Sequence, residues 1–463
     1  MLTYDLTLRG NLARYDYLYR CIKEDILSGR VAAGERLPSK RALARNLEVG
    51  VVTVENAYAQ LVAEGYLRPE EKRGYFVNPI EILRPLPSQR ELSPDDQAGA
   101  PPWLLDLTSA GSGTEGFPFS VWARLMRRVL TEQGEKLLRA MPPNGVPELR
   151  KAISRHIYQF RGISASPEQI VVGAGTEYLY NLIVQLLGRE QVYGVEDPGY
   201  SKAAKVYALN GARQVSIPVD PQGVLPQALE ESGAQVLHIS PNHQFPTGAV
   251  TPIARRQSLL RWAAQVQGRY MIEDDYDSEF RFTGRPIPTL YSIDRSDRVI
   301  YMNTFSRSLA PSLRISYMVL PLPLLEAYRS RLGFYSCTVP AMEQYTLARF
   351  LEEGRFEAHV SRMRVFYRGL RDTVLATIRG GPLAGRCQVL GEDAGLHFLL
   401  RLDTSRKDQE LSLLAGEQGI RLSFLSDYQR TPGSAPPHIL VVNYPGVDLK
   451  NLSHAMELLA QLL

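Results

Sequence analysis

Residues 192–196, Val-Tyr-Gly-Val-Glu, form a short apolar run that ends on an acidic residue. Three more short apolar runs follow along the chain, at 236–240, 270–273 and 299–302. Such runs, bounded by turn residues, are typical of buried strands. The segments between them, such as 179–187 and 252–266, have apolar residues at helical spacing. This alternation predicts an α/β layered fold for most of the chain.

The composition is that of an ordinary globular protein. The 463 residues are 44% hydrophobic and 22% charged, with a net charge of +4, which is enough chain for two or three domains. A mildly basic charge is weak support for nucleic-acid binding by itself.

The cysteines and the apolar segments indicate in which cellular compartment the protein is expected. Cys21, Cys337 and Cys387 are too far apart for a metal motif or a disulfide framework, so we expect no metal site and a reducing compartment. The first eleven residues lack a signal-peptide core, and prolines break the apolar run at 317–325, which is too short to span a bilayer. A cytoplasmic protein without a membrane partner is expected.

The first 78 residues predict a small helical body. Helices are expected over 15–27, from a cap at Ser39 through Leu47, and over a third segment that ends near Gly65. Residues 66–67 and 75–77 can then pair as a hairpin. Three helices followed by a hairpin indicate a winged helix-turn-helix.

This segment resembles the GntR-type DNA-binding domain. The resemblance is carried by Gly-Glu-Arg-Leu-Pro-Ser-Lys-Arg-Ala-Leu-Ala at 34–44, Val-Thr-Val at 52–54 and Glu-Gly-Tyr-Leu at 64–67. It implies double-stranded DNA as a partner. The first turn of the second helix suits phosphate, and the third helix would enter the major groove. The expected DNA-binding residues are Ser39, Lys40, Arg41, Thr53 and Arg73.

Two departures weaken the expected DNA contacts. Gly50-Val51 stands where the family often has Ser-Arg, and Glu70 and Glu71 place negative charge near the wing. Residues 1–78 carry twelve Lys/Arg and ten Asp/Glu, a net charge of +2. We therefore expect modest, salt-sensitive affinity for each domain, with a dimer binding two half-sites. The alternative is a winged helix that binds protein.

A proline-rich stretch separates this body from the rest of the chain. Five prolines at 85–102 alternate with polar residues, which predicts a stiff, semi-extended tether. We expect a DNA-binding domain at 1–78, a linker at 79–108 and a second domain at 109–463.

The second domain carries five separated motifs that agree in order with fold-type-I aminotransferases. They are Pro-Asn-Gly-Val-Pro-Glu-Leu-Arg at 143–150, Gly-Ala-Gly-Thr-Glu at 173–177, Glu-Asp-Pro-Gly-Tyr at 196–200, Pro-Asn-His-Gln-Phe-Pro-Thr-Gly at 241–248, and Glu-Asp-Asp-Tyr-Asp-Ser-Glu-Phe at 273–280. The resemblance implies a mostly parallel sheet between helices, with a smaller C-terminal α+β subdomain.

Together the two domains resemble the MocR subfamily of transcriptional regulators. That resemblance implies a head-to-tail homodimer whose second domain binds pyridoxal phosphate (PLP) and senses a small-molecule effector. Asp274 would contact the pyridine nitrogen, Tyr276 the ring hydroxyl and Tyr200 the ring face. The implied cofactor-binding residues are Thr176, Tyr200, Asp274, Tyr276, Thr304, Ser306 and Arg314.

Arg307 stands at the position of the Schiff-base lysine, in Thr-Phe-Ser-Arg-Ser-Leu-Ala-Pro-Ser-Leu-Arg at 304–314. A guanidinium stays protonated and cannot attack an aldehyde as a lysine amine does. The family's carboxylate-binding arginine near the C-terminus is also missing from 444–447. Three readings remain: PLP bound non-covalently, another small anion bound by Arg307, or Arg307 paired with Asp274 in an empty pocket.

We therefore expect a regulator that senses a small molecule and has no catalytic residue. The rival is a PLP-dependent aminotransferase that uses another lysine, for which Lys202 and Lys205 are the candidates. A solvated helix face is the simpler reading of both lysines.

Overall fold

The computed structural model describes residues 2–80, 103–109, 116–282, 287–392 and 395–463. The chain divides into two compact units, residues 1–100 and 101–463, and each is described by itself. Most of the expected linker at 79–108 lies outside the described residues. Among the residues described, no helix has the length and apolar character that crossing a bilayer requires.

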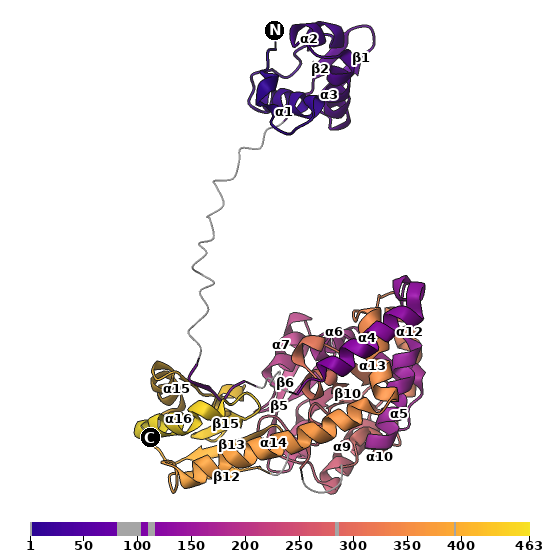
Figure 1. Ribbon diagram of the computed structural model, residues 1–463. Coiled ribbons are helices and arrows are strands. Elements are labelled where there is room, and N and C mark those ends of the chain that lie inside the picture. Colours follow the sequence, from indigo (N-terminus) through magenta and orange to yellow (C-terminus); the bar gives the residue numbers. More distant parts are fainter. Residues whose placement is uncertain (1, 81–102, 110–115, 283–286, 393–394) are drawn as a thin grey trace. The chain divides into compact units, whose positions relative to one another are not determined.

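The described part of the N-terminal unit, residues 2–80, contains three α-helices and a hairpin (Figure 1). The Ser39 hydroxyl caps α2 by accepting a hydrogen bond from the Ala42 backbone N at 3.2 Å, as the sequence predicts. Leu18, Leu43 and Leu61 are fully buried between the helices. The elements are η1 (Leu6–Arg9), α1 (Arg14–Leu27), α2 (Lys40–Asn46), α3 (Val51–Ala63), β1 (Leu67–Glu70) and β2 (Gly74–Val77). The predicted winged helix-turn-helix is confirmed.

An eight-stranded sheet forms the centre of the C-terminal unit, in the order β4-β11-β10-β9-β8-β5-β6-β7. Neighbouring strands from β10 to β6 pair in parallel, whereas β11 and β7 run antiparallel to their neighbours. The strands are β4 (Ile170–Gly173), β5 (Val192–Asp197), β6 (Arg213–Asp220), β7 (Gly223–Val224), β8 (Val236–Ile239), β9 (Tyr270–Asp274), β10 (Val299–Thr304) and β11 (Ser316–Val319). The predicted α/β fold with a mostly parallel sheet is confirmed.

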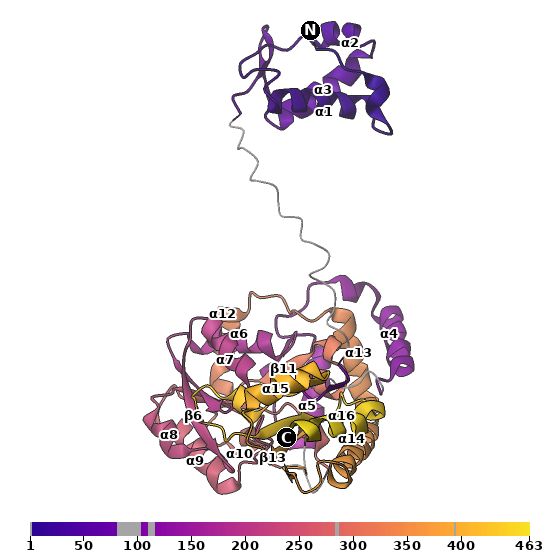
Figure 2. The same ribbon diagram turned by 90° about the vertical axis from the view of Figure 1, so that its left-hand side faces the viewer.

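Helices cover both faces of this sheet (Figures 1 and 2). Side chains alternate between faces along a strand. On β11, Tyr317 and Val319 pack in a cluster with α5 and α13, whereas Met318 packs in another with α6 and α12. The helices are α4 (Phe119–Gln133), α5 (Pro147–Arg161), α6 (Thr176–Leu187), α7 (Ser201–Leu209), α8 (Pro226–Glu231), α9 (Ile253–Gln265), α10 (Leu290–Ile293), α11 (Phe305–Ser308), α12 (Leu325–Leu332) and α13 (Ala341–Glu352).

A smaller α+β subdomain completes the C-terminal unit. Its three-stranded antiparallel sheet has the order β12-β13-β15, and β14 pairs in parallel with β3. The elements are β3 (Leu105–Asp106), α14 (Arg355–Gly380), β12 (Cys387–Leu390), β13 (His397–Leu402), α15 (Asp408–Glu417), β14 (Ile420–Arg421), β15 (Ile439–Asn443) and α16 (Leu449–Leu462).

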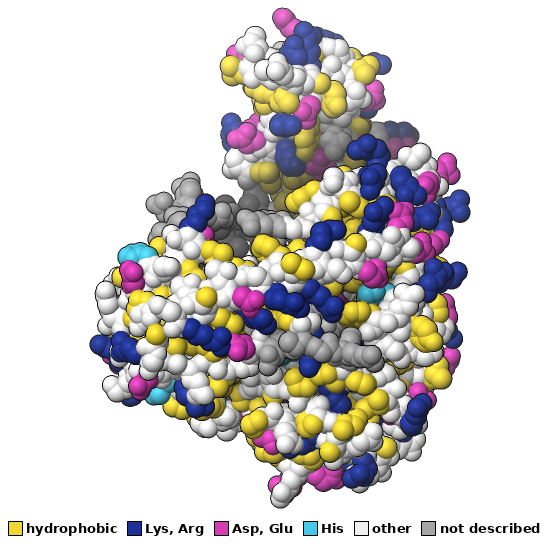
Figure 3. All heavy atoms as spheres, turned by 60° about the horizontal axis from the view of Figure 1, so that its bottom comes forward, with side chains coloured by type: hydrophobic (Ala, Val, Ile, Leu, Met, Phe, Trp, Pro, Cys, Tyr) yellow, Lys and Arg dark blue, Asp and Glu magenta, His cyan; other side chains and the backbone are white. Residues whose placement is uncertain are grey.

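On the face shown in Figure 3, basic side chains are interspersed with acidic and apolar ones.

Candidate ligand cavity and DNA-binding surface

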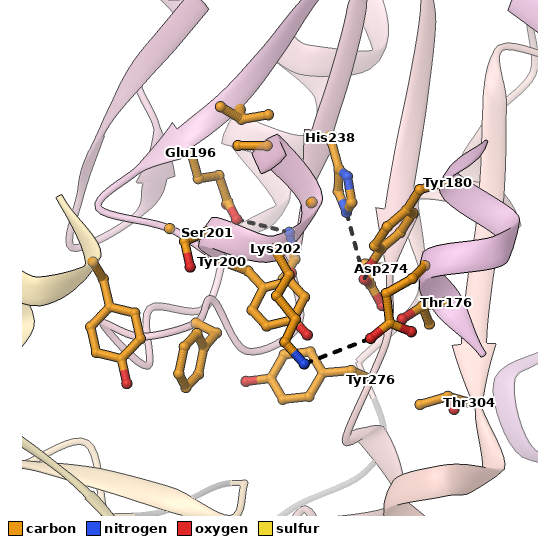
Figure 4. Close-up of a pocket in the computed structure, with 18 of the residues that line it drawn as sticks. Thr176, Tyr180, Glu196, Tyr200, Ser201, Lys202, His238, Asp274, Tyr276 and Thr304 are labelled. Carbon is orange, nitrogen blue, oxygen red and sulfur yellow. Dashed lines mark hydrogen bonds and ion pairs between the residues drawn. The ribbon is translucent and has the colours of Figure 1, made fainter. Parts of the chain in front are cut away.

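A cavity of about 480 Å³ lies at the carboxyl ends of strands β5, β8, β9 and β10. This edge of a parallel sheet is where α/β proteins usually bind their ligands. All seven expected cofactor-binding residues line it, and so does Arg307. Figure 4 shows Thr176, Tyr200, Asp274 and Tyr276 around this space. The structure therefore brings together residues that lie more than a hundred positions apart in the sequence.

Asp274 lies at the end of β9, and a series of buried polar side chains holds its carboxylate in position. The Tyr180 hydroxyl donates a hydrogen bond to Asp274 Oδ2 at 2.6 Å, and His238 Nε2 lies 3.5 Å from the same oxygen. The Tyr207 hydroxyl lies 2.7 Å from His238 Nδ1. Asp274 Oδ1 is buried and has no hydrogen-bond partner among the described residues.

Two tyrosines flank the middle of the cavity. Tyr200 is the residue just before α7, and burial raises the pKa of its hydroxyl to about 12. The Tyr276 hydroxyl lies 3.1 Å from His243 Nδ1. Burial and the charge of Asp277 raise the pKa of Tyr276 well above its usual value, although Arg307 opposes this shift. Both hydroxyls are therefore protonated at neutral pH and can donate hydrogen bonds.

Hydroxyl groups and a guanidinium gather at the other end of the cavity. Thr304 Oγ1 accepts hydrogen bonds from Ser306 N at 3.1 Å and from Ser316 Oγ at 2.7 Å. Ser306 Oγ is buried without a hydrogen-bond partner among the described residues. Thr176 begins α6, and Arg314 lines the same cavity. This donor set suits a phosphate group, because hydroxyls, a helix N-terminus and a guanidinium all bind anions.

Arg307 lies in the short helix α11, beside the aromatic wall of the cavity. Its guanidinium carbon is 5.8 Å from the centroid of the Tyr276 ring. Asp274 has Tyr180 and His238 as its partners. The three readings of Arg307, including its pairing with Asp274, stay predictions.

Several cavity residues other than Lys202 were given no ligand-binding role from the sequence. Glu177 contacts the Arg314 guanidinium, and Lys202 Nζ lies 3.7 Å from Glu177. Glu177 follows Thr176 in the motif at 173–177, and a negative charge beside an expected phosphate ligand was a sequence signal for a contact with Arg314. Tyr180, Glu196, His238 and Arg430 also line the cavity. Lys205, the second lysine of the rival reading, is exposed and is absent from the cavity lining.

The structure also brings three potential metal ligands together. His243, Asp277 and His397 each place a ligand atom within 4.8 Å of the others, and all three are buried. His243 Nδ1 already lies 2.8 Å from Asp277 Oδ2, and His397 Nε2 lies 3.0 Å from the Pro246 carbonyl oxygen. Burial and the neighbouring His243 lower the pKa of His397 to about 3. These contacts account for the cluster as a buried hydrogen-bonded network in which both rings and the carboxylate already have partners.

The expected DNA-binding residues lie on α2, α3 and the wing. Lys40 Nζ forms an ion pair with Glu55 at 2.6 Å, and Arg73 forms one with Glu70 at 2.7 Å. Arg41 is exposed in the first turn of α2, and Thr53 is half-buried in the first turn of α3. Two of the three expected basic contacts are thus engaged with neighbouring carboxylates.

Comparison with known proteins identifies both domains. Residues 14–77 match the family of bacterial regulatory proteins called gntR, and residues 109–459 match aminotransferase class I and II. The chain is 37% identical to YdeL of Bacillus subtilis, named an uncharacterized HTH-type transcriptional regulator, over 96% of this chain and 95% of that protein. It is 31% identical to the probable rhizopine catabolism regulatory protein MocR of Rhizobium meliloti, over 94% and 90% of the two chains.

The fold also has solved counterparts. An archaeal alanine:glyoxylate aminotransferase superposes with a TM-score of 0.70 at 22% identity, covering 79% of this chain and 92% of that one. The likeness in fold extends over the C-terminal unit, while the close sequence relatives are regulators. The chain therefore belongs to the MocR-type HTH transcriptional regulators, in which a gntR-family domain is joined to an aminotransferase class I and II domain.

Proposed function

We propose that this regulator binds DNA through residues 1–78 and senses a phosphate-bearing small molecule, PLP or a relative of it, through residues 109–463. Residues 79–108 join the two domains. The gntR match at 14–77 and the aminotransferase match at 109–459 support these boundaries. The regulator acts as a homodimer, because helix-turn-helix proteins commonly bind two half-sites with two subunits.

Two buried atoms that have no hydrogen-bond partner within the described ranges of the chain support PLP as the ligand. Asp274 Oδ1 can accept a hydrogen bond from the protonated pyridine nitrogen, and Ser306 Oγ can donate one to the phosphate. Thr176, Thr304 and Arg314 complete the phosphate contacts, and Tyr200 and Tyr276 contact the ring. PLP supplies an electrophilic aldehyde, which the guanidinium of Arg307 cannot attack.

Arg307 is the single observation that separates this proposal from catalysis. It lies in a cavity whose other expected residues are all present. Because it remains charged, it binds the ligand through hydrogen bonds and ionic attraction only. The head-to-tail pairing of subunits stays a prediction.

The test compares wild type with Arg307→Lys and with Arg307→Gln as the uncharged control. Each full-length protein is incubated with PLP, treated with borohydride, passed through a desalting column and weighed by mass spectrometry. We expect a covalent adduct only in Arg307→Lys, while wild type loses PLP on the column. A covalent adduct on the wild type would show that another lysine, such as Lys202, reacts, and would restore the aminotransferase reading.

A second measurement tests the regulatory link. An operator selected from random DNA with the purified protein is titrated by fluorescence anisotropy, with and without PLP. If PLP is the effector, the two DNA affinities differ, since PLP must then bind the DNA-binding conformation and the alternative conformation with different affinities. Equal affinities would exclude PLP as the signal.

A further inference from the structure

A carboxylate of the chain itself lies where the proposed ligand phosphate would bind. Glu177 contacts the Arg314 guanidinium through Oε2, and its Oε1 lies 3.7 Å from Lys202 Nζ. Figure 4 shows Lys202 among the residues that line the cavity, with a dashed line that marks this ion pair. Arg314 is the strongest anion donor of the expected phosphate site. The side chain that should bind the ligand's anion is therefore already paired.

Glu177 carries its negative charge at neutral pH. It lies in the first turn of α6, where backbone N–H groups stabilise anions. Burial raises the pKa of its carboxyl group, but hydrogen bonding at the helix N-terminus and the contact with Arg314 outweigh burial, so the pKa is below its usual value. Glu177 thus competes with any ligand anion for Arg314.

Arg314 packs closely on the loop that precedes α6. Gly175 has φ +95°, and a Cβ at this position would lie 2.2 Å from a terminal nitrogen of the Arg314 guanidinium. The Arg314 side chain is 48% exposed and the Glu177 side chain 31%, so solvent reaches both members of the pair. A ligand anion can therefore approach the pair from solvent and replace Glu177 at Arg314, whose guanidinium lies against the Gly175 loop at the start of α6.

We propose that Glu177 is a specificity-determining residue, a built-in competitor that Arg314 releases only for a phosphate dianion. The inference rests on the proposed function of the cavity. A phosphate monoester carries about −1.5 to −2 charges at pH 7, so Arg314 attracts it more strongly than the single charge of Glu177. Lys202 then balances the displaced carboxylate. A carboxylate ligand has no such advantage and leaves Glu177 in place.

The test titrates the full-length chain by calorimetry with PLP, pyridoxal, inorganic phosphate and acetate. Glu177→Gln removes the competing charge, and Glu410→Gln, an exposed glutamate paired with Arg406, is the matched control. We expect Glu177→Gln to bind PLP and inorganic phosphate about tenfold more tightly, because a like charge within a few ångströms is removed. The affinity of Glu177→Gln for pyridoxal should equal that of wild type, and Glu410→Gln should bind all four ligands as wild type does. In Glu177→Gln the ratio of phosphate affinity to acetate affinity should be smaller than in wild type.

A double variant separates this effect from a general change in structure. In an Arg314→Gln background, Glu177→Gln should no longer tighten PLP binding, because the two side chains act on each other. If wild type binds PLP and Glu177→Gln binds it equally or more weakly, the role of Glu177 is wrong and the cavity's proposed function stands. If no folded variant binds PLP or inorganic phosphate, the proposed function and this inference both fail.

Discussion

The buried carboxyl group of Glu196 makes the stability of the C-terminal unit depend on pH. Glu196 lies in β5 at the cavity wall, and burial raises the pKa of its carboxyl group to about 8 although the Ser240 backbone N donates a hydrogen bond to it. A carboxyl group whose pKa rises on folding favours the folded state when protonated. This contribution is complete below the unfolded pKa of 4.5 and is lost as the pH rises through about 8.

Glu196→Gln removes this dependence. Glutamine is a neutral isostere whose oxygen can still accept the hydrogen bond from Ser240. The shift from 4.5 to about 8 corresponds to roughly 3–5 kcal/mol of stability lost from wild type at high pH. We therefore expect equal stabilities near pH 4.5 and a variant that is more stable by roughly 3–5 kcal/mol above pH 8.

The assay is urea unfolding followed by tryptophan fluorescence at several pH values. All three tryptophans, Trp103, Trp122 and Trp262, lie in the C-terminal unit, so the signal reports that unit alone. Glu410→Gln, an exposed carboxylate, serves as the control. Parallel curves of unfolding free energy against pH for wild type and Glu196→Gln would refute the reasoning, as would a wild type that gains relative stability at high pH.

Three further predictions concern the core, the cavity and the DNA surface. Arg161→Met leaves the buried Asp275 carboxylate, 2.9 Å away in wild type, without its cation, so the unfolding free energy should fall by about 3–5 kcal/mol in the same fluorescence assay. A loss below about 1 kcal/mol would contradict a net role for the pair. Gly175→Ala places a Cβ 2.2 Å from the Arg314 guanidinium at φ +95°, so PLP affinity measured by calorimetry should fall by about tenfold or more; an unchanged affinity would argue against Arg314 as a phosphate ligand. Arg41→Ala should weaken binding to operator and unrelated DNA alike and reduce the salt dependence by about one phosphate contact, measured by anisotropy; a loss confined to the operator would contradict a phosphate contact.

The strands could be predicted because each is a short apolar run with clear ends. The run at 192–196 became β5, Val192–Asp197, and Ser39 caps α2 because its hydroxyl precedes a helical segment. The order of the strands could not be predicted in the same way. β11 inserts antiparallel between β4 and β10, and its pattern of buried side chains looks the same in either direction.

The cavity was predictable as a set of residues, but its internal contacts were not. Thr176 and Tyr200 follow strands β4 and β5, and Asp274 ends β9, so all three lie at the same edge of the mostly parallel sheet and line the cavity together. The pairing of Glu177 with Arg314 joins positions 137 residues apart, and local spacing carries no information about such pairs. The role of Arg307 also remains a prediction. The residue type shows that the side chain is a permanent cation, but the sequence does not show which ligand it binds.

Helix α7 is attached to the cavity at both of its ends. Its first turn carries Lys202, which pairs with Glu177, and its last turn carries Tyr207, which contacts His238 and through it Asp274. A molecule that contacts both Arg314 and Asp274 would therefore change the contacts at both ends of α7. The occupancy of the cavity is therefore linked, through these contacts, to the position of a helix whose other side chains, such as Leu209, lie on the surface.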